Sequence, residues 1–223
     1  MKRILIFGLI LLGGCSWGTT KSYLKDSKFQ GENYPIRTLR ILIVNKTPSP
    51  ELEKVIQKVS QKMKEEVGIE LKVIGYHWFQ TRSILGIRGY MNQLMEQTCK
   101  KQQTFDIAIF SKFTSTELAL VPLGIFMLGG IEDTYRRFIF LRVQTEFLLL
   151  HEIYHAFIFN KIHGECVMMS GFYPLGTWCK WLSVEDRKEV LRNKWRDFNI
   201  KPELPTVDEF SKGDITYECS KMQ

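Results

Sequence analysis

Residues 151–155 have the sequence HEIYH, in which two histidines stand four positions apart. Side chains four residues apart lie one above the other on an α-helix, so His151 and His155 can approach the same ion. Glu152 lies next along the helix, where it can address a water molecule on that ion. Three of the chain's four histidines fall between His151 and His163. The pattern therefore indicates a metal site on a helix, with the rest of the chain as its scaffold.

The residues that flank this stretch predict a buried helix. Thr145 can cap its start, with Glu146 in the first turn. Polar side chains are few between Glu146 and Phe159: Glu146, His151, Glu152, Tyr154 and His155. A helix that is apolar on most sides is buried, and its polar groups need partners, which a metal ion would supply. We expect the helix to end at Asn160, because asparagine tolerates the left-handed conformation.

A catalytic zinc site takes three protein ligands and keeps a fourth position open. His151 and His155 supply two imidazoles, and we expect His163 to supply the third. A continuous helix would place His163 about two turns beyond His155, so the chain must turn back after the helix. If His163 is instead a loop histidine, the third ligand is a later glutamate such as Glu185 or Glu189.

This donor set predicts hydrolysis of peptide bonds with one catalytic Zn²⁺. Zinc lowers the pKa of its bound water to about 7 and polarises a carbonyl group. Glu152 would take the proton from that water and pass it to the leaving amine. The main alternative is a non-catalytic surface protein that binds zinc for structure, but such a site needs no general base beside the ion. A coincidental motif on a core helix is the third hypothesis.

The segment before residue 145 predicts strands that alternate with helices. Ser49 and Pro50 begin a helix, apolar residues recur at helical spacing up to Val67, and Gly68 ends it. Because this helix lies between two apolar strands, we expect those strands to pair in parallel. Strands are expected at 39–44, 69–76, 105–110 and 138–143, with another candidate at 118–128 and a second helix over 90–103.

Two further local patterns lie on either side of the motif. The Gly129-Gly130 pair, followed by acidic residues, indicates a turn. Ser183 with Asp186 three residues later resembles a capping box, which begins a C-terminal helix. Four apolar residues predict that this helix is amphipathic: Val184, Leu191, Trp195 and Phe198.

The first residues predict a targeting segment. Lys2 and Arg3 precede an apolar run over 4–12 that is too short to span a bilayer. The run ends in two glycines and Cys15, and small residues before a cysteine resemble the lipobox of bacterial lipoproteins. We therefore expect a signal peptide at 1–14 and a lipidated Cys15. A plain secretory signal or a buried N-terminal strand is the alternative.

The expected organisation is a tether at 15–37 followed by one zinc-binding domain at 38–223. This domain would divide into an N-terminal subdomain at 38–160 and a C-terminal subdomain at 161–223. A lipid-anchored chain would lie in the cell envelope and face the extracytoplasmic side. There the four remaining cysteines can oxidise in three alternative pairings, of which we favour Cys166 with Cys179 because both flank one loop. The four are Cys99, Cys166, Cys179 and Cys219.

Composition narrows the class of protein. With 44% hydrophobic and 25% charged residues, the 223-residue chain is typical of a globular protein. Its formal net charge is +7, but the lysines and arginines form no stripe with interleaved aromatic residues, so we expect no nucleic-acid partner. The expected partners are a peptide or protein substrate and, through the lipid anchor, a membrane. The chain is expected to be a monomer.

Residues 145–169 resemble the metzincin clan of zinc metallopeptidases. The extended motif of that clan is His-Glu-x-x-His-x-x-Gly-x-x-His, followed by a methionine-containing turn. Cys166-Val167-Met168 resembles this Met-turn, which implies that Met168, or alternatively Met169, forms the hydrophobic floor beneath the zinc. Within the clan, the chain is most similar to the archaemetzincin-like group. The order of strands and helices before the motif matches the clan's N-terminal subdomain.

The resemblance implies an α/β (α+β) zincin-like fold. A mixed twisted sheet of about five strands would pack on a buried active-site helix, followed by a small, mostly helical C-terminal subdomain. A strand near 124–129 could pair with an extended substrate. The chain departs from the clan's pattern because Asn160 stands in place of the glycine and two extra residues separate His155 from His163. The group's second, cysteine-rich zinc site is not reproduced, and Tyr173 is expected to pack rather than to bind substrate.

Overall fold

The computed structural model describes residues 35–44, 49–78, 91, 93–98, 107–110, 129–132, 134–141, 144–159 and 182–202. Several predictions lie outside these residues: the signal segment with Cys15, the strand candidate at 118–128, Asn160, His163, Met168 and the four cysteines. Of the second predicted helix, residues 91 and 93–98 are described and are helical. Within the described ranges, no helix is both long and apolar enough to cross a membrane.

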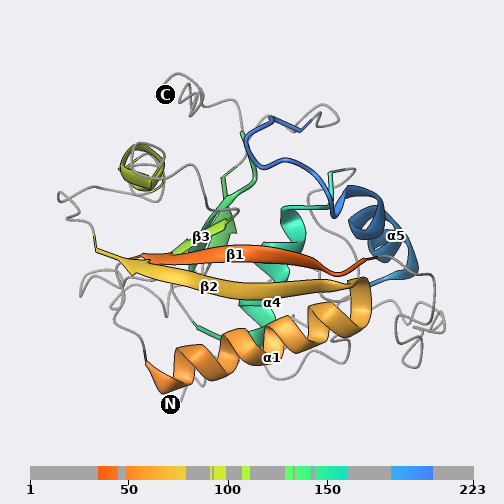
Figure 1. The fold of residues 1–223 in the computed structure, drawn as a ribbon. Coiled ribbons are helices and arrows are strands. Elements are labelled where there is room, and N and C mark those ends of the chain that lie inside the picture. Colours follow the sequence, from red (N-terminus) through yellow and green to blue (C-terminus); the bar gives the residue numbers. More distant parts are fainter. Residues whose placement is uncertain are drawn as a thin grey trace, which may run out of the picture.

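The first structural unit consists of β1 (Arg37–Val44), α1 (Pro50–Val67) and β2 (Ile69–His77), shown in Figure 1. β1 and β2 pair in parallel, as a helix between two apolar strands predicts. α1 begins where expected, because the Ser49 side chain accepts a hydrogen bond from the Leu52 backbone N–H at 3.2 Å.

The end of α1 also follows from the sequence. Gly68 has a φ of 67°, the left-handed conformation that glycine adopts without a steric penalty. Its backbone N–H donates to the Lys64 carbonyl at 3.1 Å. The helix buries its apolar side, and the acidic side chain of Glu66 is buried with it. The buried apolar residues are Leu52, Ile56, Val59, Met63 and Val67.

The sheet of the described residues is mixed, with five strands in the order β2-β1-β3-β5-β4. β3 (Ile107–Phe110) pairs in parallel with β1 and with β5 (Phe138–Leu141). β4 (Gly129–Ile131) pairs antiparallel with β5 and forms one edge of this sheet. Phe138, Phe140 and Leu141 of β5 are at most 1% exposed.

The prediction of a turn at Gly129-Gly130 is wrong, because both glycines belong to β4. The chain turns later, around residues 134–136. There the Glu132 carboxylate accepts hydrogen bonds from the backbone N–H groups of Thr134, Tyr135 and Arg137. A glycine inside a strand often marks the close approach of another group, and the approaching group here is the site helix described below.

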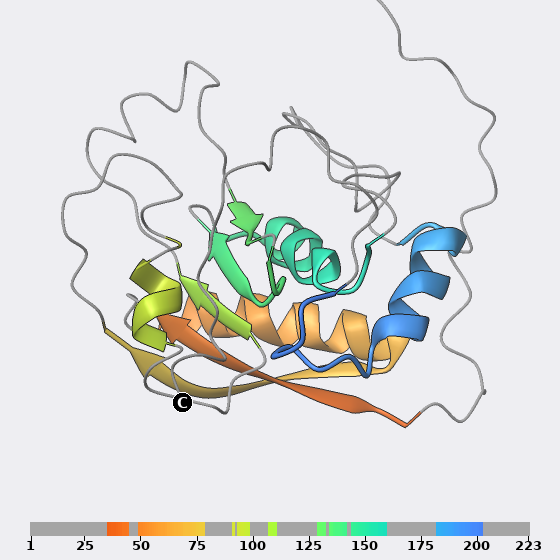
Figure 2. The same cartoon turned by 90° about the horizontal axis from the view of Figure 1, so that it is seen from above.

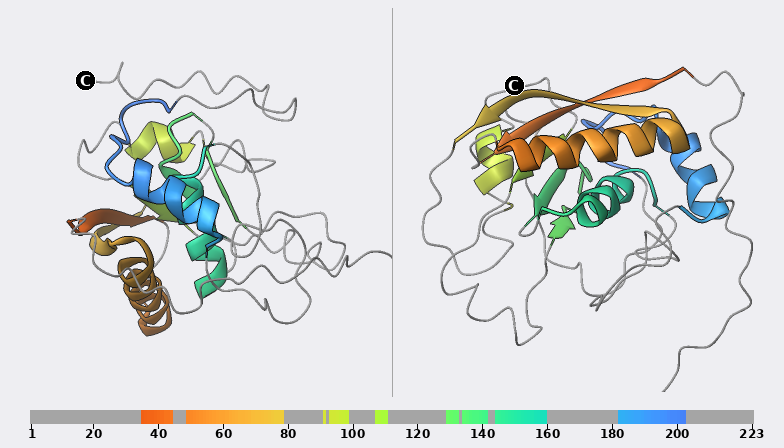
Figure 3. Two further views of the ribbon diagram at one scale, coloured as in Figure 1. Left: turned by 90° about the vertical axis from the view of Figure 1, so that its right-hand side faces the viewer. Right: turned by 90° about the horizontal axis from the view of Figure 1, so that it is seen from below.

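The helix that carries the HEIYH stretch is α4 (Glu146–His155), which contacts α1, β4 and β5 (Figure 2; Figure 3). Leu149, Leu150 and Ile153 are at most 1% exposed and join the hydrophobic core with residues of β1, α1, β3 and β5. This burial, rather than helix propensity, fixes α4 in the fold.

The C-terminal helix α5 (Val184–Asn193) lies at the C-terminal end of α1 (Figure 1). It begins as predicted, because the Ser183 hydroxyl accepts a hydrogen bond from the Asp186 N–H at 3.1 Å. Its predicted apolar face is wrong in part, because α5 ends at Asn193 and both Trp195 and Phe198 lie beyond it. Phe198 is buried, but Val184 and Trp195 are 37% and 53% exposed. Polar residues are buried instead: Asp186, Glu189 and Lys194.

Candidate metal centre

The site begins with the cap of α4. The Thr145 hydroxyl accepts a hydrogen bond from the Leu148 backbone N–H at 3.2 Å, and the Thr145 carbonyl accepts one from Leu149 at 3.1 Å. This confirms the predicted cap and sets the phase of the helix. The phase then places His151 and His155 on one face, one turn apart.

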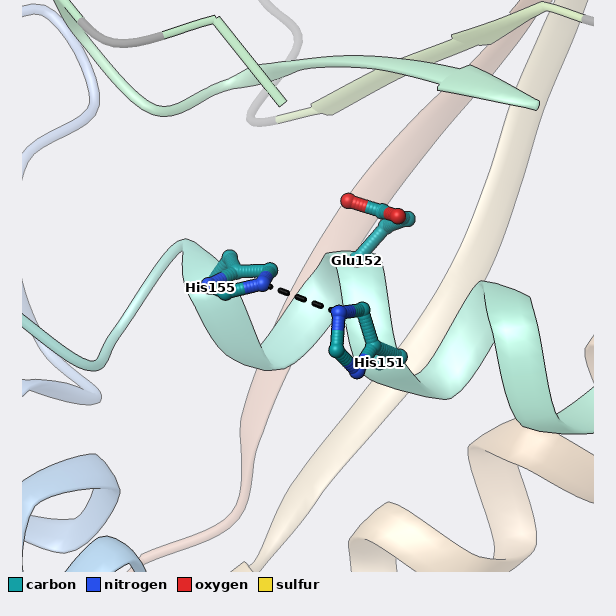
Figure 4. Close-up of side chains that lie close together, drawn as sticks. All are labelled: His151, Glu152 and His155. Carbon is teal, nitrogen blue, oxygen red and sulfur yellow. Dashed lines mark hydrogen bonds between the residues drawn. The ribbon is translucent and has the colours of Figure 1, made fainter. Parts of the chain in front are cut away.

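The two imidazoles face each other through their Nε2 atoms, which lie 3.0 Å apart (Figure 4). The ring centroids are 4.6 Å apart, and the ring planes are inclined at 85°. Two nitrogen ligands at about 2.05 Å from a tetrahedral zinc ion would lie about 3.3 Å from each other. The observed separation is within a few tenths of an ångström of that value, so His151 and His155 can hold one ion with little movement.

Glu152 completes a cluster with these histidines. The donor atoms of His151, Glu152 and His155 lie within 4.8 Å of one another. All three residues are buried, with exposed fractions of 7%, 4% and 6%. Among the residues that the structure describes, this is the one cluster of at least three such side chains that could hold a metal ion. Imidazole nitrogen and carboxylate oxygen are the donor types that zinc takes, so the residues present fit this ion.

The carboxyl group of Glu152 lies against the edge strand β4. A Cβ atom at position 129 would lie 2.8 Å from Glu152 Oε1 and 3.2 Å from its Cγ, so Gly129 is the residue that leaves room for this side chain. Burial raises the pKa of Glu152 to about 8, because the charged carboxylate loses its hydration. A cation in the cluster would oppose this effect.

The side of α4 away from Glu152 is anchored to α1 by Tyr154, the fourth residue of the motif. Its hydroxyl donates to Glu66 Oε2 at 2.7 Å, and Glu66 also accepts the Leu182 N–H. Burial raises the pKa of Glu66, although both hydrogen bonds oppose the shift. Glu66 was not recognised from the sequence. Its position three residues after Met63, on the apolar face of α1, was the signal that could have identified it.

The end of α4 differs from the prediction. The helix ends at His155 and not at Asn160, with Ala156 as its C-cap. Ala156 keeps a right-handed conformation, and its N–H bonds to a carbonyl three residues earlier. The guanidinium group of Arg136 donates to the carbonyls of His155 and Ile158. The carbonyls at the helix end are therefore bound by a side chain that is distant in the sequence.

The alternative third ligands lie outside the cluster. Glu185 is exposed, and Glu189 accepts a hydrogen bond from the Phe159 N–H. His163 and Met168 remain predictions, because they lie outside the described residues. The structure thus brings together His151, Glu152 and His155 and leaves the third imidazole untested.

No protein-family profile and no curated protein matches the sequence. Among solved structures, the chain is similar to an archaemetzincin from Methanopyrus kandleri, with 15% identity and a TM-score of 0.48 over 72% of this chain and 97% of that one. Metalloproteinase-II from Bacteroides fragilis shares 14% identity, with a TM-score of 0.42 over 72% of this chain and 54% of that one. A chain of a chaperone–substrate complex shares 13% identity, with a TM-score of 0.44 over 69% of this chain and 30% of that one.

Proposed function

We propose that the chain is a zinc-dependent peptidase in which Glu152 is the general base. One observation carries the proposal: two buried imidazoles face each other at 3.0 Å on the helix that also carries a buried carboxyl group. As neutral rings the two imidazoles can share one hydrogen bond, whereas a zinc ion would bind both ring nitrogens at once.

The residues of the cluster take separate roles. His151 and His155 hold the zinc ion, with His163 as the third ligand and Met168 beneath the site. When bound, zinc lowers the pKa of a water molecule and polarises the substrate carbonyl. Glu152 accepts the proton of the attacking water and transfers it to the leaving amine. Burial of the cluster limits the access of other water molecules to the reacting groups.

The proposed substrate is an extended peptide or protein segment. β4 is an edge strand of the described sheet, and it lies directly against Glu152. A peptide that paired with such an edge would pass its backbone beside the general base. In this proposal the fold is zincin-like and related to the metzincins, with residues 161–223 as the C-terminal subdomain.

Zinc content and peptide hydrolysis test the proposal together. Wild-type protein should contain one zinc ion and cleave a casein-type substrate, and His151→Ala should lose both the ion and the cleavage. Bound zinc without cleavage by the wild type would favour the alternative, a non-catalytic zinc-binding surface lipoprotein. Wild-type protein that takes up no zinc would show that the histidine pair is a core feature and would end the proposal.

We also propose that the protein is a monomeric lipoprotein of the cell envelope, anchored through Cys15. The support is the basic start, the short apolar run and the small residues before Cys15. Wild-type protein should incorporate labelled palmitate in a bacterial host and fractionate with membranes. Cys15→Ser should do neither, whereas equal labelling of the two proteins would contradict the anchor.

A further inference from the structure

The five residues that end and leave the site helix are each held through the backbone by a side chain from elsewhere. Arg136 donates to the carbonyls of His155 and Ile158. The other three groups are bound by residues that follow in the C-terminal segment. Arg196 donates to the Ala156 carbonyl at 2.9 Å, Asn193 donates to the Phe157 carbonyl at 2.8 Å, and Glu189 accepts the Phe159 N–H.

This arrangement replaces the usual end of a helix. The last carbonyls of a helix have no partner within it, and water or the backbone N–H groups of a glycine-containing turn commonly donate to them. Ala156, Phe157 and Ile158 are fully buried, so water does not reach them. A buried carbonyl without a partner is costly, and cationic groups are favourable at the negative end of a helix. The two arginines therefore donate hydrogen bonds to these carbonyls and also place positive charge at the negative end of the helix.

The two arginines that bind the helix end are themselves fixed. Arg136 has a φ of 50°, which is unfavourable for a residue other than glycine and persists only where the surroundings determine it. Arg196 donates to the carbonyls of Tyr135 and Arg136, and thereby joins the turn to the C-terminal segment. Arg196 stays largely protonated near neutral pH, although burial lowers its pKa to about 10.

We infer that Arg136, Glu189, Asn193 and Arg196 form a clamp that positions His155 as a metal ligand. His155 is the last residue of α4, and helix ends fray unless they are held. A metal site tolerates displacements of only about 0.5 Å in its ligands. The clamp keeps the final turn closed and so holds His155 Nε2 opposite His151 Nε2. These are positioning residues, and their role rests on the proposed zinc function.

Glu189 gives the sharpest test, because it was also a candidate ligand. Zinc affinity is measured by competition with a chelator, and the absorption spectrum of the Co²⁺-substituted protein reports the coordination geometry. Glu189→Ala should weaken zinc binding about tenfold, the usual size of such an effect, and should alter the Co²⁺ spectrum. Glu189→Gln keeps an acceptor for the Phe159 N–H and should retain both wild-type properties. Glu185→Ala, on the exposed side of the same helix, is the matched control.

The zinc affinities and Co²⁺ spectra of these variants either support the positioning role of Glu189 or contradict it. A loss in Glu189→Gln as large as in Glu189→Ala would indicate a ligand and overturn the positioning role. Wild-type affinity and spectrum in Glu189→Ala would overturn it as well. If Glu189→Ala does not fold, which thermal unfolding of the zinc-free protein shows, Asn193→Ala is measured in the same way against Arg192→Ala. Wild-type protein that binds no zinc would refute the proposed function itself, whereas wild-type zinc binding with unaffected variants would refute the clamp alone.

Discussion

The side of α4 that carries Tyr154 and the side that carries Glu152, about 160° apart around the helix axis, hold buried polar groups in opposite situations. On the back face, the Tyr154 hydroxyl is satisfied by Glu66 and ties α4 to α1. On the site face, two imidazoles and the carboxyl group of Glu152 converge within 4.8 Å. The back-face pair stabilises the fold, whereas the site-face cluster gathers groups that suit a ligand. Proteins commonly give up stability at functional sites in this way.

This difference predicts that substitutions on the two faces of α4 separate activity from stability. Under the proposed function, a change on the site face should abolish hydrolysis and leave the protein as stable as before or more stable. A change on the back face should weaken the fold and leave the chemistry largely intact.

The Glu152→Gln substitution should have the largest effect. Removal of a general base lowers the turnover number by about 100-fold or more. The same substitution should stabilise the zinc-free protein at pH 7. The pKa of Glu152 is about 8 in the folded state, above its value of 4.5 in the unfolded state. The stability that the protonated carboxyl group contributes at low pH is therefore lost as the pH rises from the unfolded pKa to the folded pKa. Glutamine does not titrate, so the variant avoids this loss. Turnover and chemical unfolding of the zinc-free protein measure the two effects, and a destabilised variant would contradict the contrast.

Gly129→Ala in β4 should reduce turnover by displacing the carboxyl group of Glu152. The added Cβ atom would lie 2.8 Å from Glu152 Oε1, which forces the carboxyl group to move. We expect turnover to fall about tenfold, since small misplacements of a catalytic group are costly. Gly75→Ala in β2 is the control, because its Cβ atom would meet Leu42 at an ordinary 3.7 Å. Equal turnover in the two variants would show that Glu152 does not depend on the space at position 129.

Tyr154→Phe should affect stability and spare the chemistry. The substitution removes the 2.7 Å hydrogen bond to Glu66 and should lower the free energy of unfolding by about 1–2 kcal/mol. Zinc content and turnover should stay near wild-type levels. Tyr76→Phe is the matched control, since that hydroxyl makes a longer, exposed hydrogen bond to Glu53, and its loss should change stability by less than about 0.5 kcal/mol. A Tyr154→Phe protein that loses zinc would mean that the two faces are coupled.

Glu66→Gln should change how stability depends on pH. The pKa of Glu66 is raised, mainly by burial, so the folded state binds its proton more tightly than the unfolded state. The stabilisation from that proton is complete below the unfolded pKa and is lost as the pH rises through the folded pKa. Between these two pKa values, the free energy of unfolding of the variant should improve relative to wild type by up to about 1.4 kcal/mol for each pH unit. Exposed Glu65→Gln should run parallel to wild type, and a parallel Glu66→Gln curve would contradict the prediction.

Helix starts could be predicted from the sequence because their determinants are local. Ser49, Thr145 and Ser183 each accept a hydrogen bond from a backbone N–H three residues later. The motif spacing likewise predicts that two imidazoles share one face of a helix. These contacts involve one turn of chain, so a short window of sequence contains both partners.

The predictions that were wrong concern features that depend on contacts between residues distant in the sequence. The early end of α4 depends on Arg136, 19 residues before His155, and on Arg196, 40 residues after Ala156. The strand at Gly129 depends on close packing against Glu152. A short window of sequence does not include both residues of any of these contacts. The Gly129-Gly130 dipeptide by itself is also typical of a turn. Sequence patterns therefore predicted the chemical groups of the site better than the surroundings that hold them.

The long separation between the clamp and the histidines has a consequence for the time at which the site forms. Translation delivers the HEIYH stretch before it delivers Asn193 and Arg196, which bind the residues that follow α4. An unfinished chain thus contains the metal-binding motif and Arg136 without the three later residues of the clamp. Under the proposed function, a ribosome-bound chain would carry no competent site, and hydrolytic capacity would arise only after synthesis has passed residue 196.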